Sequence, residues 1–427
     1  MKHSRRAFIE AGLVIPAALG AAPSLLEPIS STTSTARDSS FDPWVEIHRE
    51  NLRHNVQEIS RSVSGRPILA VIKNNGYGTG VVNIAQLLEP QSEIHGFAVV
   101  KLHEAHSLRD AGVKKPILLL GPFDEQNLSD AVARNITPMV YTPLGPALDK
   151  ISVRLQKPVP LVICIDTGIG RVGVPYRDAA PLVRDLAGRK SVQILSAMMT
   201  FTEDPDFDHE QLRRFTETCA SLEKEGIALG KKHAASSFAL FQHPDAFLDM
   251  VRPGMAIYGI YSENEFRHTN ILDLRPAISL KSRVIYVKKL RKGESAGYNR
   301  AYVAKDDVWV ATLPVGHADG WPRTAAPSTG RPLHGQKGAK VRISSSDSAT
   351  AVATAINGSE LYPVVASVSA SHCIVEVGSE EKVKIGDVAN FFDAQNGSRP
   401  EDVSEACGAS VYDLTMHLNP LLPRRIV

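Results

Sequence analysis

Short apolar segments alternate with amphipathic ones along much of the chain. From Pro67 to residue 260 the apolar segments read PILAVI, HGFAVV, PILLLG, ITPMV, PLVICID, VQILSAMM, KKHAAS and MAIYGI. The segments between them, such as GVVNIAQLLE and LHEAHSLRDAG, carry apolar residues at the i, i+3, i+4 spacing of helices that bury one face. These eight strand–helix units predict an α/β fold, a (β/α)8 TIM barrel. An open, doubly wound parallel sheet would produce the same alternation.

The pattern changes after Tyr258. Strand-like runs such as AISLKSRVIYVKKL, VWVATLPVG, LYPVVASVSASHCIVEV and KVKIGDVANFF follow one another with turn residues between them and no long helix. This texture predicts a separate, mainly β domain. The boundary falls in the segment SENEFRHTNILDL, so residues 41–268 are expected to form the barrel and residues 269–427 the C-terminal β domain.

The N-terminal segment, SRRAFIEAGLVIPAALGAAPS, places Arg5 and Arg6 before a modest apolar run and a small-residue stretch. It resembles a twin-arginine export signal, and the polar tract that follows predicts a linker, so residues 1–40 are assigned to signal and linker. A basic start without a signal function and a short anchor are the alternatives. Because Pro16 and Gly20 interrupt the apolar run, no stable membrane insertion is expected. We predict export to the periplasm or cell envelope, or a cytoplasmic location if the signal is not used.

Charge and composition narrow the function classes. The 48 Lys and Arg residues nearly balance the 46 Asp and Glu residues, and only 6% of residues are aromatic. This composition argues against nucleic-acid binding. The four cysteines lie far apart without a CxxC pair, so neither a metal site nor a disulfide framework is indicated. Chemistry on a small molecule is therefore expected.

One lysine has a placement suited to catalysis. In ILAVIKNNGYGTG, Lys73 ends the first predicted barrel strand, and catalytic groups of TIM barrels lie at the C-terminal ends of strands. Burial lowers the pKa of a lysine amine and makes the neutral, nucleophilic form accessible for attack on a carbonyl compound. A strand-end lysine that reaches solvent is the commoner alternative.

The wider motif AVIKNNGYGTG resembles the signature of the alanine racemase family. Members of this family are fold-type III pyridoxal-phosphate (PLP) enzymes. The motifs IDTGIGRVGV, MVRPGMAIYGI, GESAGYNRAYVA, PVGHADGWPR and VKIGDVANFF follow in the family's order, and the resemblance runs from Trp44 to the C-terminal PRRIV. It implies a PLP-dependent racemase that interconverts L- and D-alanine.

The resemblance also implies a cofactor site. Lys73 would carry PLP, and Tyr77 would bind its phosphate together with the hydroxyl of Ser237. Gly254 and Met255 match backbone positions near the phosphate, where glycine permits close approach of the main chain.

Arg252 of VRPG matches the arginine that faces the pyridine nitrogen of the cofactor. A guanidinium only donates hydrogen bonds, so it would leave that nitrogen unprotonated and weaken the ring as an electron sink. A weaker sink favours return of the proton over side reactions such as transamination, and it argues against a lyase or decarboxylase.

Racemisation needs an acid/base group on each face of a planar intermediate. The resemblance assigns one face to Lys73 and the other to Tyr298 of the partner subunit, in a head-to-tail homodimer with two composite sites. Arg171 matches an arginine near the phenolic oxygen, where a positive charge would stabilise phenolate.

Several positions depart from the family pattern. Cys164 stands where many members have a lysine that braces the arginine, and Thr200 replaces a histidine that bonds the pyridine-facing arginine. Ser236 replaces an asparagine and His317 an entrance tyrosine. The sequence SAS at 369–371 replaces a bulkier methionine and an acid near the substrate carboxylate. Three functions remain open: an ordinary alanine racemase, a racemase of broader amino-acid specificity, and a PLP-binding homologue with little turnover.

Overall fold

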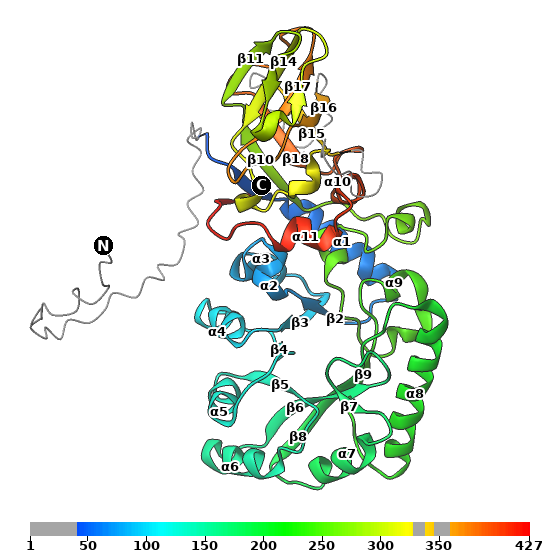
Figure 1. The fold of residues 1–427 in the computed structure, drawn as a ribbon. Coiled ribbons are helices and arrows are strands. Elements are labelled where there is room, and N and C mark those ends of the chain that lie inside the picture. The colour runs from blue at the N-terminus through cyan, green and yellow to red at the C-terminus, as the bar shows by residue number, and fades with distance from the viewer. Residues whose placement is uncertain (1–40, 328–337, 346–358) are drawn as a thin grey trace, which may run out of the picture. The chain divides into compact units, whose positions relative to one another are not determined.

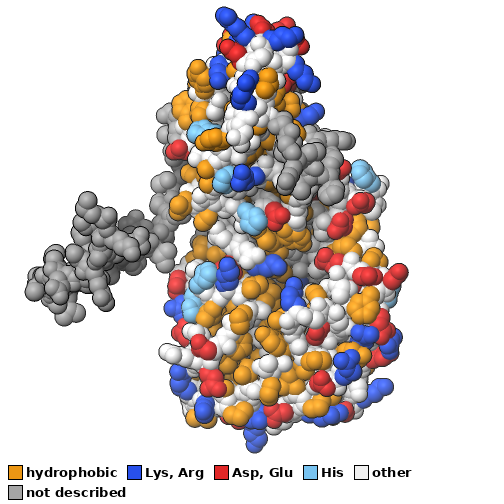
Figure 2. Space-filling view, in the orientation of Figure 1, with side chains coloured by type: hydrophobic (Ala, Val, Ile, Leu, Met, Phe, Trp, Pro, Cys, Tyr) orange, Lys and Arg blue, Asp and Glu red, His pale blue; other side chains and the backbone are white. Residues whose placement is uncertain are grey.

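The computed structural model describes residues 41–327, 338–345 and 359–427 (Figure 1). The predicted export signal and linker, residues 1–40, lie outside this part. No helix among the described residues has both the length and the apolar content that a membrane crossing requires. On the face shown in Figure 2, basic and acidic side chains are interspersed rather than gathered by sign.

The first sheet is built from strands that alternate with helices. Seven strands run parallel in the order β2-β3-β4-β5-β6-β8-β9, and the short β7 (Val174–Pro175) pairs with β6. The strands are β2 (Ile68–Val71), β3 (Ile94–Val99), β4 (Ile117–Leu119), β5 (Ile136–Val140), β6 (Val159–Asp166), β8 (Val192–Met198) and β9 (Lys231–His233). The helices between them are α3 (Val81–Leu88), α4 (Leu102–Asp110), α5 (Glu125–Ala133), α6 (Gly145–Leu155), α7 (Ala179–Ala187) and α8 (Pro205–Lys224).

Residues 249–253 occupy the eighth strand position between β9 and β2. On one side the Arg252 N–H donates to the Ala235 carbonyl at 2.8 Å, and on the other the Leu69 N–H donates to the Val251 carbonyl at 2.9 Å. The TIM-barrel prediction is therefore confirmed.

The segment MAIYGI was expected to be the eighth strand, and this expectation is wrong. Met255–Tyr258 instead form the 3-10 helix η2, whose residues are all buried. A short apolar run that is buried on every side has no period that separates strand from helix. The strand position goes to the preceding, more polar segment.

The barrel interior is filled by side chains from successive strands. They form a core cluster of their own, separate from the larger one that the helices help to build. Its buried members are Leu69, Ala98, Leu118, Met139, Val162, Cys164, Met198 and Met250. This packing closes the barrel below the strand ends, so the open rim is left for chemistry.

The second sheet confirms the mainly β C-terminal domain. Its nine strands run in the order β11-β14-β17-β16-β15-β18-β10-β1-β19. The first described strand, β1 (Trp44–Ile47), belongs to this sheet, where it pairs with β10 and β19. The others are β10 (Ile278–Arg283), β11 (Tyr286–Leu290), β14 (Val308–Leu313), β15 (Lys340–Ser344), β16 (Glu360–Val365), β17 (Cys373–Gly378), β18 (Val388–Phe392) and β19 (Arg424–Ile426). Two helices, α10 (Pro400–Cys407) and α11 (Val411–Met416), precede β19.

Candidate active site

Lys73 is separated from the end of β2 by one residue, Ile72, and lies at the start of a left-handed turn that Figure 1 labels α2 (Lys73–Tyr77). Asn74, Asn75, Gly76 and Tyr77 have φ angles of 54, 55, 62 and 53°. Glycine adopts this region freely and asparagine tolerates it better than other residues. The sequence NNG therefore permits a turn at the strand end that most sequences would resist.

The environment of the Lys73 amine favours its neutral form. The side chain is half-buried, and burial lowers the pKa of Lys73 below its ordinary value. The positive charge of Arg171 lowers it further, whereas the carboxylates of Glu203 and Glu104 act in the opposite direction. A neutral amine at the rim of a barrel is a nucleophile and a proton acceptor.

Hydrogen-bond donors converge beside this turn. Tyr77 is buried, and a Cβ placed on Gly254 would lie 2.2 Å from its phenolic oxygen. The Ser237 Oγ accepts from the N–H groups of Gly254 and Ala256 at 2.9 and 3.2 Å, so its own O–H is left to donate. The Met255 N–H has no acceptor among the described residues. Two hydroxyls and a main-chain N–H around a glycine fit a phosphate group.

Arg252 lies within the eighth strand position and is buried. Its Nη1 donates to the carbonyl and Nδ1 of His233, both within 2.8 Å, and its Nη2 donates to the carbonyls of Met199 and Ala234 at 2.6 and 3.2 Å. Burial lowers the pKa of Arg252 to about 10, so the guanidinium stays charged at neutral pH. Within the described residues Nε makes no hydrogen bond, which leaves one donor for a ligand.

His233 is a site residue that the sequence interpretation missed. Arginine can only donate, so His233 Nδ1 accepts and its proton lies on Nε2, 3.0 Å from Ser196 Oγ. Burial and the Arg252 charge hold the pKa of His233 well below its ordinary value, which keeps the ring neutral. The available signal was its position at the end of KKH, four residues before Ser237.

Arg171 lies on the loop after β6, exposed and without an ion pair to any described residue. The Asp166 carboxylate shapes this loop by accepting from the N–H groups of Gly168 and Gly170 at 2.9 and 3.2 Å. Cys164 donates its thiol hydrogen to a carbonyl of the same loop at 3.7 Å. Burial raises the pKa of Cys164 to about 11, so a neutral thiol stands where the family's lysine would brace the arginine.

Tyr298 lies in the β domain, in the 3-10 turn η4 (Tyr298–Arg300), and is 73% exposed. Its side chain makes no hydrogen bond or ring contact with the described residues. A single chain therefore gathers Lys73, Tyr77, Ser237 and Arg252 at one rim and leaves Tyr298 outside.

Two family models cover nearly all of the described chain. The model for the alanine racemase N-terminal domain matches residues 47–262, and the model for the C-terminal domain matches residues 277–426. The chain belongs to the alanine racemase family. It is an amino-acid racemase, an isomerase.

Relatives and solved structures agree with this assignment. The alanine racemase of Desulforamulus reducens is 31% identical over 388 residues, which cover 89% of this chain and 98% of that one. The enzyme of Clostridium tetani is 29% identical over 389 residues, or 89% and 94% of the two chains. The structure of alanine racemase from Clostridium difficile 630 matches with a TM-score of 0.78 and 26% identity, covering 91% and 96%. A histidine racemase from Leuconostoc mesenteroides, with a TM-score of 0.76 and 24% identity over 91% and 99%, shares the fold.

In this alanine racemase family member, Tyr412 of α11 also belongs to the site. The Tyr77 ring centroid lies 4.9 Å from that of Tyr258 and 6.4 Å from that of Tyr412. Burial and the carboxylates of Glu203 and Glu263 raise the pKa of Tyr412 to about 12, so its phenol remains a donor. The sequence interpretation missed this residue, because a lone tyrosine in a short C-terminal helix carries no local signal.

The departures from the alanine racemase pattern have structural consequences. Because His233 bonds Arg252, the substitution at Thr200 does not deprive that arginine of a histidine partner. The segment 369–371 forms a turn against the GHADG motif, where the His317 N–H donates to the Ser369 carbonyl at 3.0 Å. A Cβ at Gly316 would lie 2.3 Å from the Ala370 carbonyl carbon.

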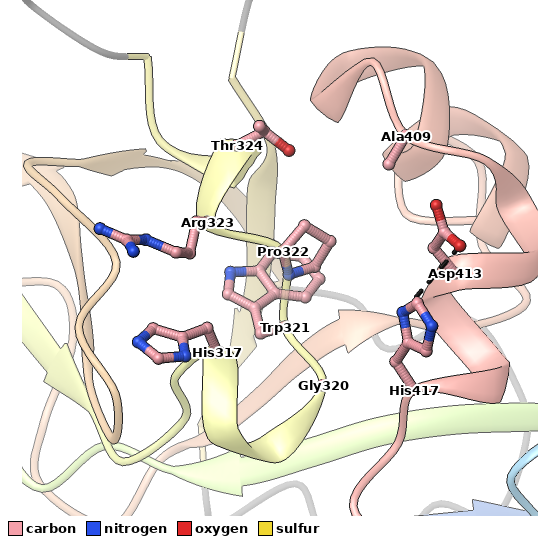
Figure 3. Close-up of a pocket in the computed structure, with 9 residues that line it drawn as sticks. All are labelled: His317, Gly320, Trp321, Pro322, Arg323, Thr324, Ala409, Asp413 and His417. Atoms are coloured by element: carbon pink, nitrogen blue, oxygen red, sulfur yellow. Dashed lines mark ion pairs between the residues drawn. The ribbon is translucent and has the colours of Figure 1, made fainter.

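A hollow of about 350 Å³ lies between this motif and α11 (Figure 3). His317 and Trp321 line one side, and the 3.9 Å ion pair between His417 and Asp413 lines the other. None of the residues around Lys73 of the same chain lines it. The full lining is His317, Gly320, Trp321, Pro322, Arg323, Thr324, Ala409, Asp413 and His417.

Proposed function

We propose that this protein interconverts L- and D-alanine with PLP held on Lys73, in a homodimer whose sites are shared between subunits. The observation that carries the proposal is the convergence of the Lys73 amine, the Tyr77–Ser237 donors and the Arg252 guanidinium at one end of the barrel. The first group suits covalent attachment, the second a phosphate and the third an aromatic nitrogen.

The residues present fit the cofactor. Tyr77 and Ser237 would hold the phosphate with the Met255 N–H, and Arg252 Nε would donate to the pyridine nitrogen. When bound, PLP withdraws electrons from the substrate Cα and so acidifies its hydrogen. The carbonyls and the imidazole around Arg252 hold its guanidinium in place, which fixes the direction of the donor.

Proton transfer falls to two side chains. The Lys73 amine, whose pKa is lowered by burial and by Arg171, would take or return the Cα proton on one face. The partner subunit's Tyr298 would act on the other face in a head-to-tail homodimer. The exposure of Tyr298 in the single chain is consistent with a role across an interface.

The decisive experiment uses purified, PLP-loaded protein with L-alanine in deuterated water. We expect exchange of the α-proton by NMR and formation of D-alanine by chiral chromatography. Lys73→Ala should abolish both, whereas Lys101→Ala is the matched control, since Lys101 is an exposed lysine that also follows a barrel strand. Bound PLP with neither exchange nor D-isomer, for any amino acid tested, would reject racemisation and favour a cofactor-binding protein.

Export is proposed on the pattern of Arg5 and Arg6 before the apolar run. The twin-arginine route carries folded proteins, which suits an enzyme that acquires its cofactor before crossing. In a bacterium with this pathway, we expect racemase activity in the periplasmic fraction and its retention in the cytoplasm when Arg5 and Arg6 are both replaced by Lys. Unchanged fractionation of the double variant would reject the signal.

A second candidate function is racemisation of amino acids with cationic side chains, and Glu203 favours it. This residue lies on the loop after β8 with φ 67°. Its N–H and the Thr202 hydroxyl donate to the buried Asp208 carboxylate at 3.2 and 2.9 Å. The loop conformation is thus fixed by interior contacts, whereas the Glu203 side chain itself is exposed.

The Glu203 carboxylate lies close enough to the site for its charge to raise the pKa of both Lys73 and Tyr412. Glu203 makes no ion pair with a described Lys or Arg. Because the surroundings of Lys73 favour its neutral amine, a substrate ammonium or guanidinium would supply a cation that this carboxylate lacks.

The test compares kcat/KM for L-lysine with kcat/KM for L-alanine. We expect Glu203→Gln to lower the lysine-to-alanine ratio by about tenfold. That change corresponds to a loss of about 1.4 kcal/mol from the interaction between the carboxylate and the substrate cation. Glu217→Gln, at an exposed acid of α8, is the control. If L-lysine is not turned over, the second candidate fails. If it is turned over and Glu203→Gln leaves the ratio unchanged, Glu203 does not select cationic side chains, and alanine stays the proposed substrate.

A further inference from the structure

Arg424 near the C-terminus makes an unusual set of contacts. Its Nε and Nη2 both donate to the carbonyl of Gly78, at 3.1 and 2.8 Å. Its Nη1 donates to the carbonyls of Asn419, at 2.7 Å, and Leu422. No described carboxylate pairs with it. Burying a cation without a carboxylate partner is costly. We therefore interpret these contacts of Arg424 as fixing the main-chain segments whose carbonyls it binds.

Gly78 closes the turn that begins at Lys73. It too is left-handed, with φ 88°, and a Cβ there would lie 2.1 Å from the Thr415 carbonyl of α11. The Asn74 amide donates to the Met416 sulfur at 3.4 Å. The C-terminal segment thus packs directly against the turn that carries the lysine.

A run of five positive φ angles, with Tyr77 among them, is strained and persists only where the surroundings impose it. At the start of the run, the buried Glu104 carboxylate accepts the Asn75 N–H at 2.7 Å. At the end, the Arg424 fork holds the Gly78 carbonyl. These two charged groups bracket the turn, and Tyr77 lies between them.

We propose that Arg424 is a positioning residue that keeps the Lys73–Gly78 turn left-handed and thereby presents Lys73 and Tyr77 to the cofactor. The presentation of Lys73 and Tyr77 to the cofactor rests on the proposed function, whereas the effect of Arg424 on the turn does not. Arg424 belongs to β19, which pairs with β1 through Val45. The residue therefore ties the second sheet to the catalytic end of the barrel.

The test uses the full-length protein and three variants. Arg424→Ala removes the fork, and Arg424→Lys keeps the charge but cannot present two parallel donors to one carbonyl. Arg425→Ala is the matched control, since it removes the same charge from the neighbouring position, where the guanidinium lies over Trp44 at 4.3 Å.

Two readouts separate positioning from general stability. In hydrogen–deuterium exchange, we expect Arg424→Ala to speed exchange of the peptide spanning residues 73–80 by about tenfold. The peptide covering β10 should stay unchanged. In a PLP titration followed by absorbance, we expect the dissociation constant of PLP to be about tenfold higher for Arg424→Ala than for the wild type. Arg424→Lys should fall between wild type and Arg424→Ala, and Arg425→Ala should match wild type in both readouts.

Equal exchange of residues 73–80 in the wild type and the Arg424 variants would overturn the proposal, and so would faster exchange spread evenly over the chain. If Arg424→Ala does not fold, Arg424→Lys decides by the same comparison. If the wild type binds no PLP, the proposed function fails, and the exchange data alone still decide the role of Arg424.

Discussion

His233 Nδ1 accepts a hydrogen bond of 2.8 Å from Arg252 Nη1 at the rim of the barrel. The same guanidinium nitrogen also donates to the His233 carbonyl. One residue of β9 thus supplies two of the four acceptors that hold Arg252. Since the ring is neutral, it adds no second positive charge next to the guanidinium, which would repel it in a site of low dielectric.

We expect His233→Ala to weaken both stability and catalysis. The substitution removes one acceptor from a buried cation and leaves a cavity, a loss of about 1–3 kcal/mol by the cost of an unmade buried hydrogen bond. Thermal unfolding should shift to lower temperature, and kcat/KM should fall by about tenfold. His233→Gln retains an acceptor and should recover part of both losses. If Gln behaves like Ala, the hydrogen bond is not the reason for the residue.

The barrel and the lysine turn were predictable because their signals are local. The end of the strand, the lysine and the glycine-rich turn all lie within residues 71–80. The alternation of strands and helices repeats along the chain. The eighth strand position was not predictable in this way. Residues 249–253 include an aspartate, an arginine and a proline, and they are recruited as a strand only by the edges of β9 and β2.

Residues whose role depends on distant partners were also missed. His233 is one polar residue at a strand end, and it acquires a function only because Arg252 arrives beside it 19 residues later. Tyr412 lies far along the chain from Tyr77 and meets it through the packing of α11. Tyr298 has no partner among the described residues, so its catalytic role stays a prediction about a second subunit.

Gly254 tests the close approach of Tyr77 to the main chain. Alanine at this position would place a Cβ 2.2 Å from the phenolic oxygen, so Tyr77 must move and the phosphate donors separate. We expect PLP affinity to fall by at least about tenfold, because overpacking costs on the order of 1–3 kcal/mol. The measurement is a PLP titration by absorbance.

Gly188→Ala is the matched control for this change. Neither glycine has a positive φ, but only the αR conformation of Gly188 (φ −70°, ψ −9°) suits alanine fully; Gly254 (φ −116°, ψ −86°) lies outside the α region, which adds backbone strain to the contact with Tyr77. Gly188 is exposed, and its nearest neighbour to a new Cβ is a backbone oxygen at 3.3 Å. Equal PLP affinity in the two variants would show that the Tyr77 contact is unimportant for the cofactor.

The pH dependence of Lys73 reactivity tests the charges around it. Burial and Arg171 lower the pKa of Lys73 below 10.5, and the Glu203 carboxylate raises it. Removing that carboxylate destabilises the ammonium form, so Glu203→Gln should lower the pKa further and speed amine labelling at a pH of about 9. Competition labelling of PLP-depleted protein, with mass spectrometry and the exposed Lys305 as internal reference, measures this. Slower or unchanged labelling of Lys73 in Glu203→Gln would show that the Glu203 carboxylate does not act on the Lys73 amine.

Mixing two inactive variants tests whether Tyr298 acts across a subunit interface. Lys73→Ala and Tyr298→Phe homodimers should each lose most turnover. If each site takes Lys73 from one subunit and Tyr298 from the other, a mixed dimer has one native site and one doubly substituted site. Random exchange of equal amounts makes half of the dimers mixed, so about a quarter of the native activity should return. Should Tyr298 instead serve its own chain, no site in any mixture would hold both groups, and mixing after subunit exchange would restore nothing.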